Sequence, residues 1–424
     1  MGDADISDKS AKQFHQAAGL FAQGRYPEAA AALAPAAEQG DREAQNLLGI
    51  MYLNALGVQQ TPSQAAALFG MAAASGLKEA HYNFSNLLYN GLGIKRDEAL
   101  AQEHLIQAGR AGHRPALRAL GYLYHLLGNR EPQWARLSTD CFRSAADAGD
   151  PLSKYTLGLR AQRGDGAEQD LSVAAHWFRA AAQDGVYLAS ARLAELQSMG
   201  WNSTYRDSRE MADRSNHAVT LLPFRLPGPA VFTSQNEVAF VSEYPQVLDT
   251  YLCDHLINVT APQLAPSGVV DPRTGIAMKS ELRTSYSMCF QASMYDGVMA
   301  QIAVRIASIA GVSPECAEPM GVLRYSPGQE YQPHYDYYSD AQHEAQRVTT
   351  VFVYLNDVLE GGGTEFPRLG AIVKPERGKA VKFMNCDASH RPNPDTLHAG
   401  LPVIRGEKWL ATLWFWDRPF IWFS

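Results

Sequence analysis

A repeat of 36 to 37 residues occupies the first half of this 424-residue chain. Its fixed mark is a glycine, found at Gly40, Gly76, Gly112, Gly149 and Gly185. Seven residues before each glycine stands a large apolar residue (Leu33, Phe69, Leu105, Phe142, Phe178), and four residues after it a small one (Ala44, Ala80, Ala116, Ser153, Ala189). Glycine commonly ends a helix in the left-handed conformation, and small residues let helix backbones approach. The pattern therefore predicts helical hairpins stacked into an α-solenoid.

This repeat resembles the Sel-one-like repeats, relatives of the tetratricopeptide repeats, over about residues 12 to 198 in roughly five units. The resemblance implies a curved interaction scaffold with a long concave face. The alternative is that the array only stabilises or solubilises its neighbour. The histidines of this half lack metal-ligand spacing, so we interpret them as surface or packing residues: His81, His104, His113, His125 and His176.

The repeat stops near Gly200, and Pro223, Pro227 and Pro229 then prevent any long regular element. We place a helical repeat domain at residues 1–200, a Pro-containing linker at 201–230 and a second domain at 231–424. Because proline-rich segments are semi-rigid, the two domains are expected to keep a preferred orientation.

The second domain shows helical patterns over Glu243–Ile257 and Val298–Ala310, followed by short apolar runs between glycines and prolines. These runs are Val322–Tyr325, Val348–Leu355, Ala371–Lys374, Ala380–Met384, Val403–Ile404 and Trp409–Trp416. Short strands at such spacing are typical of a β-sandwich or barrel. The fold class predicted for the chain is α+β multidomain, with an N-terminal α-solenoid and a C-terminal β-rich domain.

Two histidines and an aspartate in this domain form a candidate metal site. His334 and Asp336 are two residues apart, so both side chains point to one side of a strand or its end, and His398 follows 62 residues after the aspartate. Two imidazoles and one carboxylate on one side of a metal suit non-haem Fe(II) and leave positions open for co-substrate and dioxygen. Since the chain has 12 histidines, this spacing alone is a weak signal.

Lys408 strengthens the signal. It comes ten residues after His398, beyond a turn, and shares one strand face with Leu410, Thr412 and Trp414. A lysine that points into an apolar barrel needs a carboxylate to offset its desolvation, and this face supplies none. A bound dicarboxylate is the natural counter-ion. The alternative is a surface lysine on an edge strand.

Three blocks around these residues resemble the prolyl 4-hydroxylase branch of the Fe(II)/2-oxoglutarate dioxygenases. They are Arg324–Asp336, Gly361–Pro367 and Asp395–Trp409, in family order, and the resemblance spans about residues 232 to 424. It implies a double-stranded β-helix, or jelly roll, that carries iron between its two sheets. It also implies a 2-oxoglutarate-dependent dioxygenase of the procollagen-proline 4-dioxygenase kind, using Fe(II), 2-oxoglutarate, O2 and ascorbate as reductant.

Carried over residue by residue, the resemblance implies a ligand set and an anchor for the co-substrate. The Fe(II) ligands would be His334, Asp336 and His398, and the distal carboxylate of 2-oxoglutarate would be held by Lys408, Tyr325 and Thr364. A lysine with hydroxyl donors is what a carboxylate in a dry pocket requires.

Other matched positions carry weaker implications. Arg347 and Trp414 match positions near the peptide substrate, with a surface arginine and a core tryptophan as the alternative. Asp395 would orient the second histidine. Gly363 stands where the family often has glutamate, which puts any role of that glutamate in doubt. The polar segment Ser339–Gln346, with His343, is expected to be a mobile loop over the mouth of the site.

Charge and cysteine content restrict partners and compartment. Thirty-seven basic against 44 acidic residues give a net charge of -7, so nucleic acid and anionic lipid are not expected partners. The richest apolar run, Ala65–Ala74, is too short to span a bilayer. Five scattered cysteines without C-x-x-C spacing predict a reducing compartment, and we expect a cytoplasmic protein.

The leading functional hypothesis is a hydroxylase of a prolyl residue in a protein or peptide, with the helical repeats recruiting substrate or partner. A second hypothesis is an oxygenase of a small molecule, such as a free or tethered amino acid. The third is a non-catalytic adaptor that keeps the oxygenase fold as a binding module.

Overall fold

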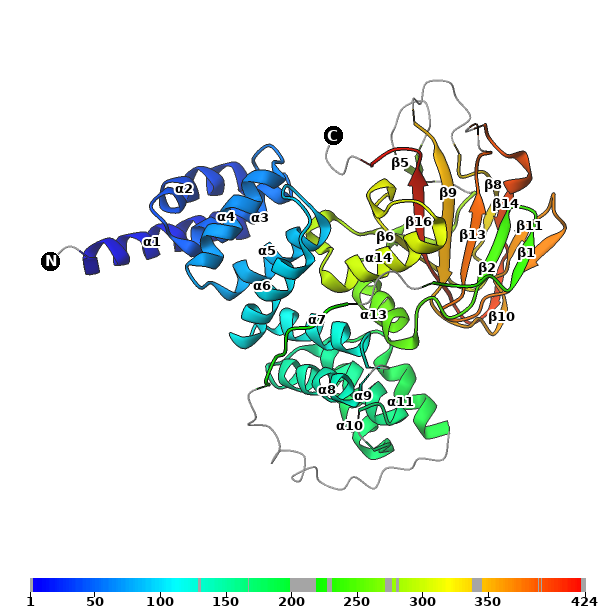
Figure 1. The fold of residues 1–424 in the computed structure, drawn as a ribbon, viewed down its shortest axis with the longest axis horizontal. Coiled ribbons are helices and arrows are strands. Elements are labelled where there is room, and N and C mark those ends of the chain that lie inside the picture. The colour runs from blue at the N-terminus through cyan, green and yellow to red at the C-terminus, as the bar shows by residue number, and fades with distance from the viewer. Residues whose placement is uncertain are drawn as a thin grey trace.

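The computed structural model describes residues 3–128, 131–166, 168–198, 219–226, 231–270, 277–279, 282–337, 345–387, 389 and 391–420. Helices run in an arc through the first half of the chain, and a β-sandwich follows in the second half (Figure 1). None of the described helices is long and apolar enough to cross a bilayer.

The first half forms the predicted solenoid of helical hairpins. Its helices are α1 (Asp3–Ala22), α2 (Tyr26–Glu38), α3 (Arg42–Leu53), α4 (Pro62–Ala74), α5 (Lys78–Asn90), α6 (Glu98–Arg110), α7 (Arg114–His125), α8 (Pro132–Asp147), α9 (Pro151–Arg163), α10 (Leu171–Gln183) and α11 (Ala189–Ser198).

The repeated glycines end the helices as predicted. All five have φ between +73° and +90°, the left-handed region that glycine adopts without strain. After α2, the Asp41 N–H donates to the Ala36 carbonyl (3.0 Å) and the Gly40 N–H to the Ala37 carbonyl (3.1 Å). This is the Schellman pattern, and it recurs at the other four glycines. The ten large and small residues that flank the glycines are 0% exposed, which confirms their packing role.

The second half contains the following elements. They are β1 (Asn236–Val238), β2 (Val241–Tyr244), α13 (Thr250–Thr260), β3 (Ala265–Pro266), β4 (Gly268–Val270), β5 (Ala277–Lys279), β6 (Tyr286–Cys289), α14 (Gly297–Ala310), β7 (Gly321–Tyr325), β8 (Tyr331–His334), β9 (Arg347–Tyr354), β10 (Glu360–Gly361), β11 (Thr364–Phe366), β12 (Ala371–Val373), β13 (Ala380–Met384), β14 (His398–Gly400), β15 (Val403–Arg405) and β16 (Lys408–Trp416), with short 3-10 turns at Ala261–Gln263, Ala292–Met294, Pro314–Cys316 and Pro394–Thr396.

The helix expected over Glu243–Ile257 starts later than predicted. The N–H groups of Val247 and Leu248 both point to the Gly378 carbonyl, so these apolar residues belong to a turn and not to the helix. Asp249 then caps α13, accepting a hydrogen bond from the Leu252 N–H (3.0 Å).

Two antiparallel sheets face each other and form the jelly roll. The larger sheet has the strand order β1-β2-β13-β9-β16-β7-β6-β3, and the smaller has β12-β11-β14-β8. Side chains alternate along each strand. On β9, Phe352 and Tyr354 join the core between the sheets, whereas Val351 and Val353 join a core on the outer face of the larger sheet.

This outer core is shared with the repeats. It runs from Leu88 in α5 to Phe415 in β16 and includes α13 and α14, which lie between the helical arc and the larger sheet (Figure 1). Where α13 faces the repeats, the carboxylate of Asp254 is 1% exposed. It accepts hydrogen bonds from Tyr155 of α9 (2.6 Å), Arg192 of α11 (2.8 Å) and Arg377 (2.6 Å). The orientation of the two halves is thus fixed by a buried interface.

Part of the expected linker also packs on the repeats. Within the described residues 219–226, Leu221 and Phe224 are buried, and the Leu222 carbonyl accepts a hydrogen bond from Tyr124 Oη at 2.7 Å. Most of the linker 201–230 lies outside the described residues.

Candidate active site

A cavity of about 450 Å³ opens between the two sheets. All eight residues predicted to bind the metal, the co-substrate or the substrate line it: Tyr325, His334, Asp336, Arg347, Thr364, His398, Lys408 and Trp414. Seven of them lie on strands β7, β8, β9, β11, β14 and β16, and Asp336 lies two residues beyond the end of β8. The fold therefore brings together side chains that lie up to 89 residues apart in the chain, from Tyr325 to Trp414.

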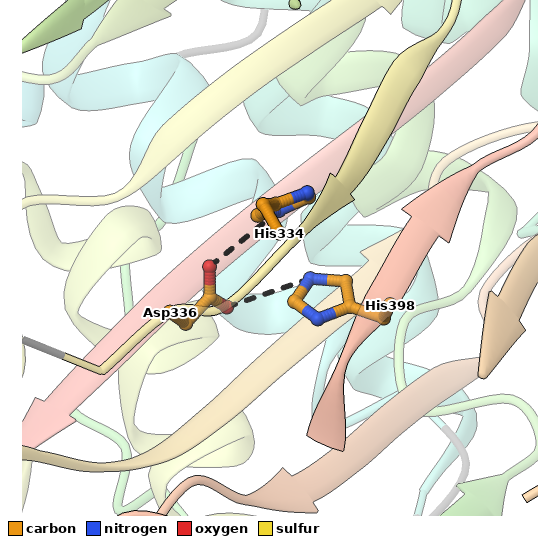
Figure 2. Close-up of side chains that lie close together, drawn as sticks. All are labelled: His334, Asp336 and His398. Atoms are coloured by element: carbon orange, nitrogen blue, oxygen red, sulfur yellow. Dashed lines mark ion pairs between the residues drawn. The ribbon is translucent and has the colours of Figure 1, made fainter. Parts of the chain in front are cut away.

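The three candidate metal ligands converge in this cavity. His398 of β14 is the direct cross-strand partner of His334 at the end of β8, and Asp336 follows two residues later. Asp336 Oδ1 lies 3.7 Å from His334 Nε2, and Asp336 Oδ2 lies 3.8 Å from His398 Nε2. Figure 2 shows the three side chains pointing toward one another. Among the described residues, they are the group whose ligand atoms, all within 4.8 Å of one another, could hold a metal ion.

Backbone carbonyls orient both imidazole rings. His334 Nδ1 lies 2.8 Å from the Gln332 carbonyl oxygen, and His398 Nδ1 lies 3.0 Å from that of Thr396. A carbonyl only accepts, so each Nδ1 carries a proton and each Nε2 is the ring nitrogen left to bind a metal. The prediction that Asp395 orients His398 is wrong, because the Thr396 carbonyl occupies the one ring nitrogen left for that role.

The protonation states suit metal binding. Burial, followed by the nearby His398 ring, lowers the pKa of His334, so its imidazole is neutral. Burial alone would raise the pKa of Asp336, but the two histidines, Arg347 and the Thr350 hydroxyl outweigh it and hold that pKa below its usual value. Two imidazoles and one carboxylate are the donor set that Fe(II) takes in facial-triad sites.

Lys408 lies in the wall of the same cavity. It is the cross-strand neighbour of Tyr325 and is 1% exposed. Its ammonium forms no hydrogen bond with any residue that the structure describes, although Nζ lies 4.6 Å from the centre of the Tyr325 ring. Burial lowers the pKa of Lys408 to about 7. A buried cation with no counter-ion fits an anionic ligand such as the distal carboxylate of 2-oxoglutarate.

Comparison with known proteins agrees with this geometry. Residues 320–416 match the family model described as the 2OG-Fe(II) oxygenase superfamily. Probable prolyl 4-hydroxylase 8 of Arabidopsis thaliana is 36% identical over 199 residues, which cover 42% of this chain and 68% of the plant protein. The chain belongs to the prolyl 4-hydroxylase branch of the 2OG-Fe(II) oxygenases.

The repeats of this oxygenase match the Sel1 repeat model over residues 42–77, 78–113, 114–150 and 151–186. Among solved structures, the viral collagen prolyl hydroxylase of Paramecium Bursaria Chlorella virus-1 in its 2OG complex is 30% identical and covers 42% of this chain and 97% of its own, with a TM-score of 0.35. A Sel1 repeat protein from Oxalobacter formigenes is 32% identical and covers 40% of this chain and 49% of its own, with a TM-score of 0.38.

The hydroxyl of Thr364 is part of a pair that the sequence did not reveal. Thr364 Oγ1 lies 2.8 Å from the hydroxyl of Tyr354 on β9, and both residues are buried. Tyr354 shares the inner face of β9 with Phe352, so strand alternation could have placed it between the sheets. Its contact with Thr364 of β11 depends on how the two sheets of the oxygenase face each other, which no local pattern specifies.

At the other side of the cavity, Arg347 stands among aromatic and acidic groups. Its Cζ lies 4.4 Å from the centre of the Trp414 ring, and Nη2 donates to Glu318 Oε2 at 2.8 Å. Arg347 is thus a cavity residue of the oxygenase and not the surface arginine weighed as the alternative. Sequence reasoning missed Glu318, which also accepts a hydrogen bond from Trp416 Nε1 at 2.8 Å.

Two further lining residues were missed, Tyr331 and Arg283. The Tyr331 ring stacks on the His334 ring with 3.5 Å between centres, and the guanidinium of Arg283 lies over the Tyr331 ring with Cζ 5.1 Å from its centre. The expected loop Ser339–Gln346, including His343, lies mostly outside the described residues.

Proposed function

We propose that this protein hydroxylates a prolyl residue in a protein or peptide, using Fe(II), 2-oxoglutarate and O2. The single observation that carries the proposal is one cavity lined both by the candidate ligand group His334, Asp336 and His398 and by Lys408, whose ammonium has no hydrogen-bond partner among the described residues. The prolyl specificity is supported by the relatives, whose names describe them as prolyl 4-hydroxylases.

In this proposal, His334, Asp336 and His398 hold the iron, and Lys408 anchors the distal carboxylate of 2-oxoglutarate. Tyr325 is the cross-strand neighbour of the lysine and Thr364 lines the same cavity, and we assign both of them hydrogen bonds to that carboxylate. When bound, the metal and 2-oxoglutarate would activate O2, so that one oxygen atom hydroxylates an unactivated C–H bond and the other enters succinate as 2-oxoglutarate loses carbon dioxide. Ascorbate as reductant and a cytoplasmic location are part of the same proposal.

The remaining walls of the cavity exclude water and position the substrate. Leu323, Phe352 and Leu410 line it with hydrocarbon, which keeps the anchored carboxylate and the ammonium in a dry environment. We assign Arg347 and Trp414 to the substrate side, because their guanidinium and indole groups lie together on the cavity wall.

We also propose that the helical repeats recruit the substrate or a partner. No described residue of the repeats lines the cavity, so recruitment would use a separate surface. A structural role for the repeats has its own support in the core that they share with α13 and α14. Turnover of an intact target and of a short peptide from it separates these roles, because equal kcat/KM values would remove recruitment.

The function is tested by mass spectrometry of products. Proline-containing peptides and free proline are incubated separately with the protein, Fe(II), 2-oxoglutarate and ascorbate, and a gain of one oxygen is sought. The proposal expects hydroxylated peptide and no product with His398→Ala. Hydroxylation of the free amino acid alone would support the small-molecule alternative, and succinate formation unchanged by His398→Ala would contradict every catalytic interpretation.

A further inference from the structure

The carboxylate of Asp336 is held by a chain of hydrogen bonds that starts outside the cavity. Thr350 Oγ1, on β9, donates to Asp336 Oδ2 at 2.8 Å, and Asn385 Nδ2, just after β13, donates to Thr350 Oγ1 at 2.9 Å. Thr350 is 2% exposed and Asn385 is 0% exposed. Because they are shielded from water, these two hydrogen bonds are stronger than exposed ones would be, and the first of them restricts rotation of the carboxylate.

The chemistry of the three side chains decides which atom donates in each of these hydrogen bonds. An ionised carboxylate only accepts hydrogen bonds, so the hydroxyl proton of Thr350 must point at Asp336. The hydroxyl oxygen can then only accept, and the amide nitrogen of Asn385, not its oxygen, must face it. The amide oxygen Oδ1 is left buried with no hydrogen-bond partner in the described part of the chain.

That unpaired oxygen argues for a role beyond packing. A buried polar atom without a partner costs about 1–3 kcal/mol, and a residue that served only to fill space would avoid this cost by being apolar. Asn385 keeps this unfavourable buried oxygen, and its amide nitrogen donates the hydrogen bond that leaves the Thr350 hydroxyl free to donate only to Asp336.

The backbone of Asn385 is itself rigidly placed. Its N–H donates to the Val348 carbonyl of β9 at 2.9 Å, and its carbonyl accepts the Asn393 N–H at 2.8 Å. The Asn393 carbonyl in turn accepts a hydrogen bond from Thr396 Oγ1 at 2.7 Å. The Thr396 carbonyl orients His398. Asn385 is therefore linked by hydrogen bonds to both candidate ligands, to Asp336 through Thr350 and to His398 through Asn393 and Thr396.

We propose that Asn385 and Thr350 are positioning residues that fix the Asp336 carboxylate for metal binding. The inference rests on the proposed metal site and extends it to two residues outside the ligand group. A carboxylate free to rotate would spend only part of its time with an oxygen facing both Nε2 atoms, so the affinity for the metal would fall. Changes to the groups that orient metal ligands typically cost ~10- to 100-fold in affinity.

The test measures binding of cobalt(II), a probe with visible absorption bands, by titration of the full-length chain. Thr350→Val and Asn385→Leu each keep the approximate shape of the side chain and remove one donor, and both are expected to weaken cobalt(II) binding by ~10- to 100-fold. Thr350→Ser retains the hydroxyl and should restore binding. Thr349→Val is the matched control, because Thr349 is a buried neighbour whose side chain points to the opposite face of β9.

The double variant Thr350→Val/Asn385→Leu adds a further criterion. Asn385 acts on Asp336 through Thr350, so the two losses should not add. The double variant should have about the same cobalt(II) affinity as whichever single variant loses more. Independent, additive losses would overturn the proposal, as would equal losses for Thr350→Ser and Thr350→Val at matched melting temperatures. Failure of the unaltered chain to bind cobalt(II) would instead refute the metal site on which this proposal rests.

Discussion

Replacing Lys408 by methionine should make the ligand-free protein more stable while it removes affinity for 2-oxoglutarate. Lys408 is 1% exposed, and its ammonium has no counter-ion among the described residues. Burial moves the pKa of Lys408 from its ordinary value of 10.5 to about 7. Because a tenfold change in a proton-binding constant corresponds to about 1.4 kcal/mol, a fully protonated Lys408 costs the folded state about 5 kcal/mol.

The sign of the pH dependence follows from the lowered pKa. Between pH 7 and 10.5 the folded chain binds fewer protons at Lys408 than the unfolded chain, so this residue makes the free energy of unfolding rise with pH. The cost is fully present below pH 7 and disappears above 10.5. Lys408→Met should therefore add about 4 kcal/mol to the free energy of unfolding at pH 7. At pH 9 the gain should fall to about 2 kcal/mol.

The assay is urea unfolding of the ligand-free protein at both pH values, with and without 2-oxoglutarate and a redox-inert divalent ion. At a concentration 100 times its Kd, the ligand should stabilise the unaltered chain by about 2.7 kcal/mol and leave Lys408→Met unchanged. The control is Lys374→Met, at an exposed lysine of the same domain, which should change neither quantity. A less stable Lys408→Met protein at pH 7, or one that 2-oxoglutarate still stabilises, would refute this reasoning.

Two further predictions concern the helical repeats. Asp254→Ala leaves two arginines without their shared buried carboxylate and should lower the free energy of unfolding by about 3–5 kcal/mol in urea; a loss below about 1 kcal/mol would contradict the role assigned to this contact. Gly158→Ala should destabilise the protein by about 1–3 kcal/mol in thermal unfolding, because the new Cβ would lie 2.6 Å from Phe178 Cδ1. Gly70→Ala, whose nearest contact would be 3.6 Å, is its control and should be neutral or stabilising by up to about 1 kcal/mol.

The solenoid and the main strands were predictable because each carries a local signal. A glycine that must adopt positive φ, a small residue at a helix contact and a two-residue alternation are properties of single positions, and the repeat shows the first two five times over. The start of α13 was not predictable in this way. Val247 and Leu248 have helical apolar spacing, yet their N–H groups bond to Gly378, about 130 residues later.

In the candidate site, too, the residues with a local sequence signal were predictable and those placed by long-range pairing were not. His334, Asp336, His398 and Lys408 were found from spacing and resemblance, since strand pairing converts those spacings into proximity. Asn385 was not found, because its contact with Thr350 depends on the pairing of β13 with β9 and no spacing marks it. A residue such as Asn385, which reaches a candidate ligand only through another side chain, has no sequence motif that marks it.

The shared core also restricts how recruitment by the repeats could work. Because α13 and α14 are packed on both the repeats and the larger sheet, the repeats cannot swing a bound chain toward the cavity without breaking that core. A tethered substrate gains effective concentration only if it is long enough to reach both surfaces. Lengthening a peptide substrate should therefore leave KM unchanged until the peptide spans that distance, and then lower KM without raising kcat. A KM that falls smoothly from the shortest peptides onward would place all the binding energy in the cavity and its rim.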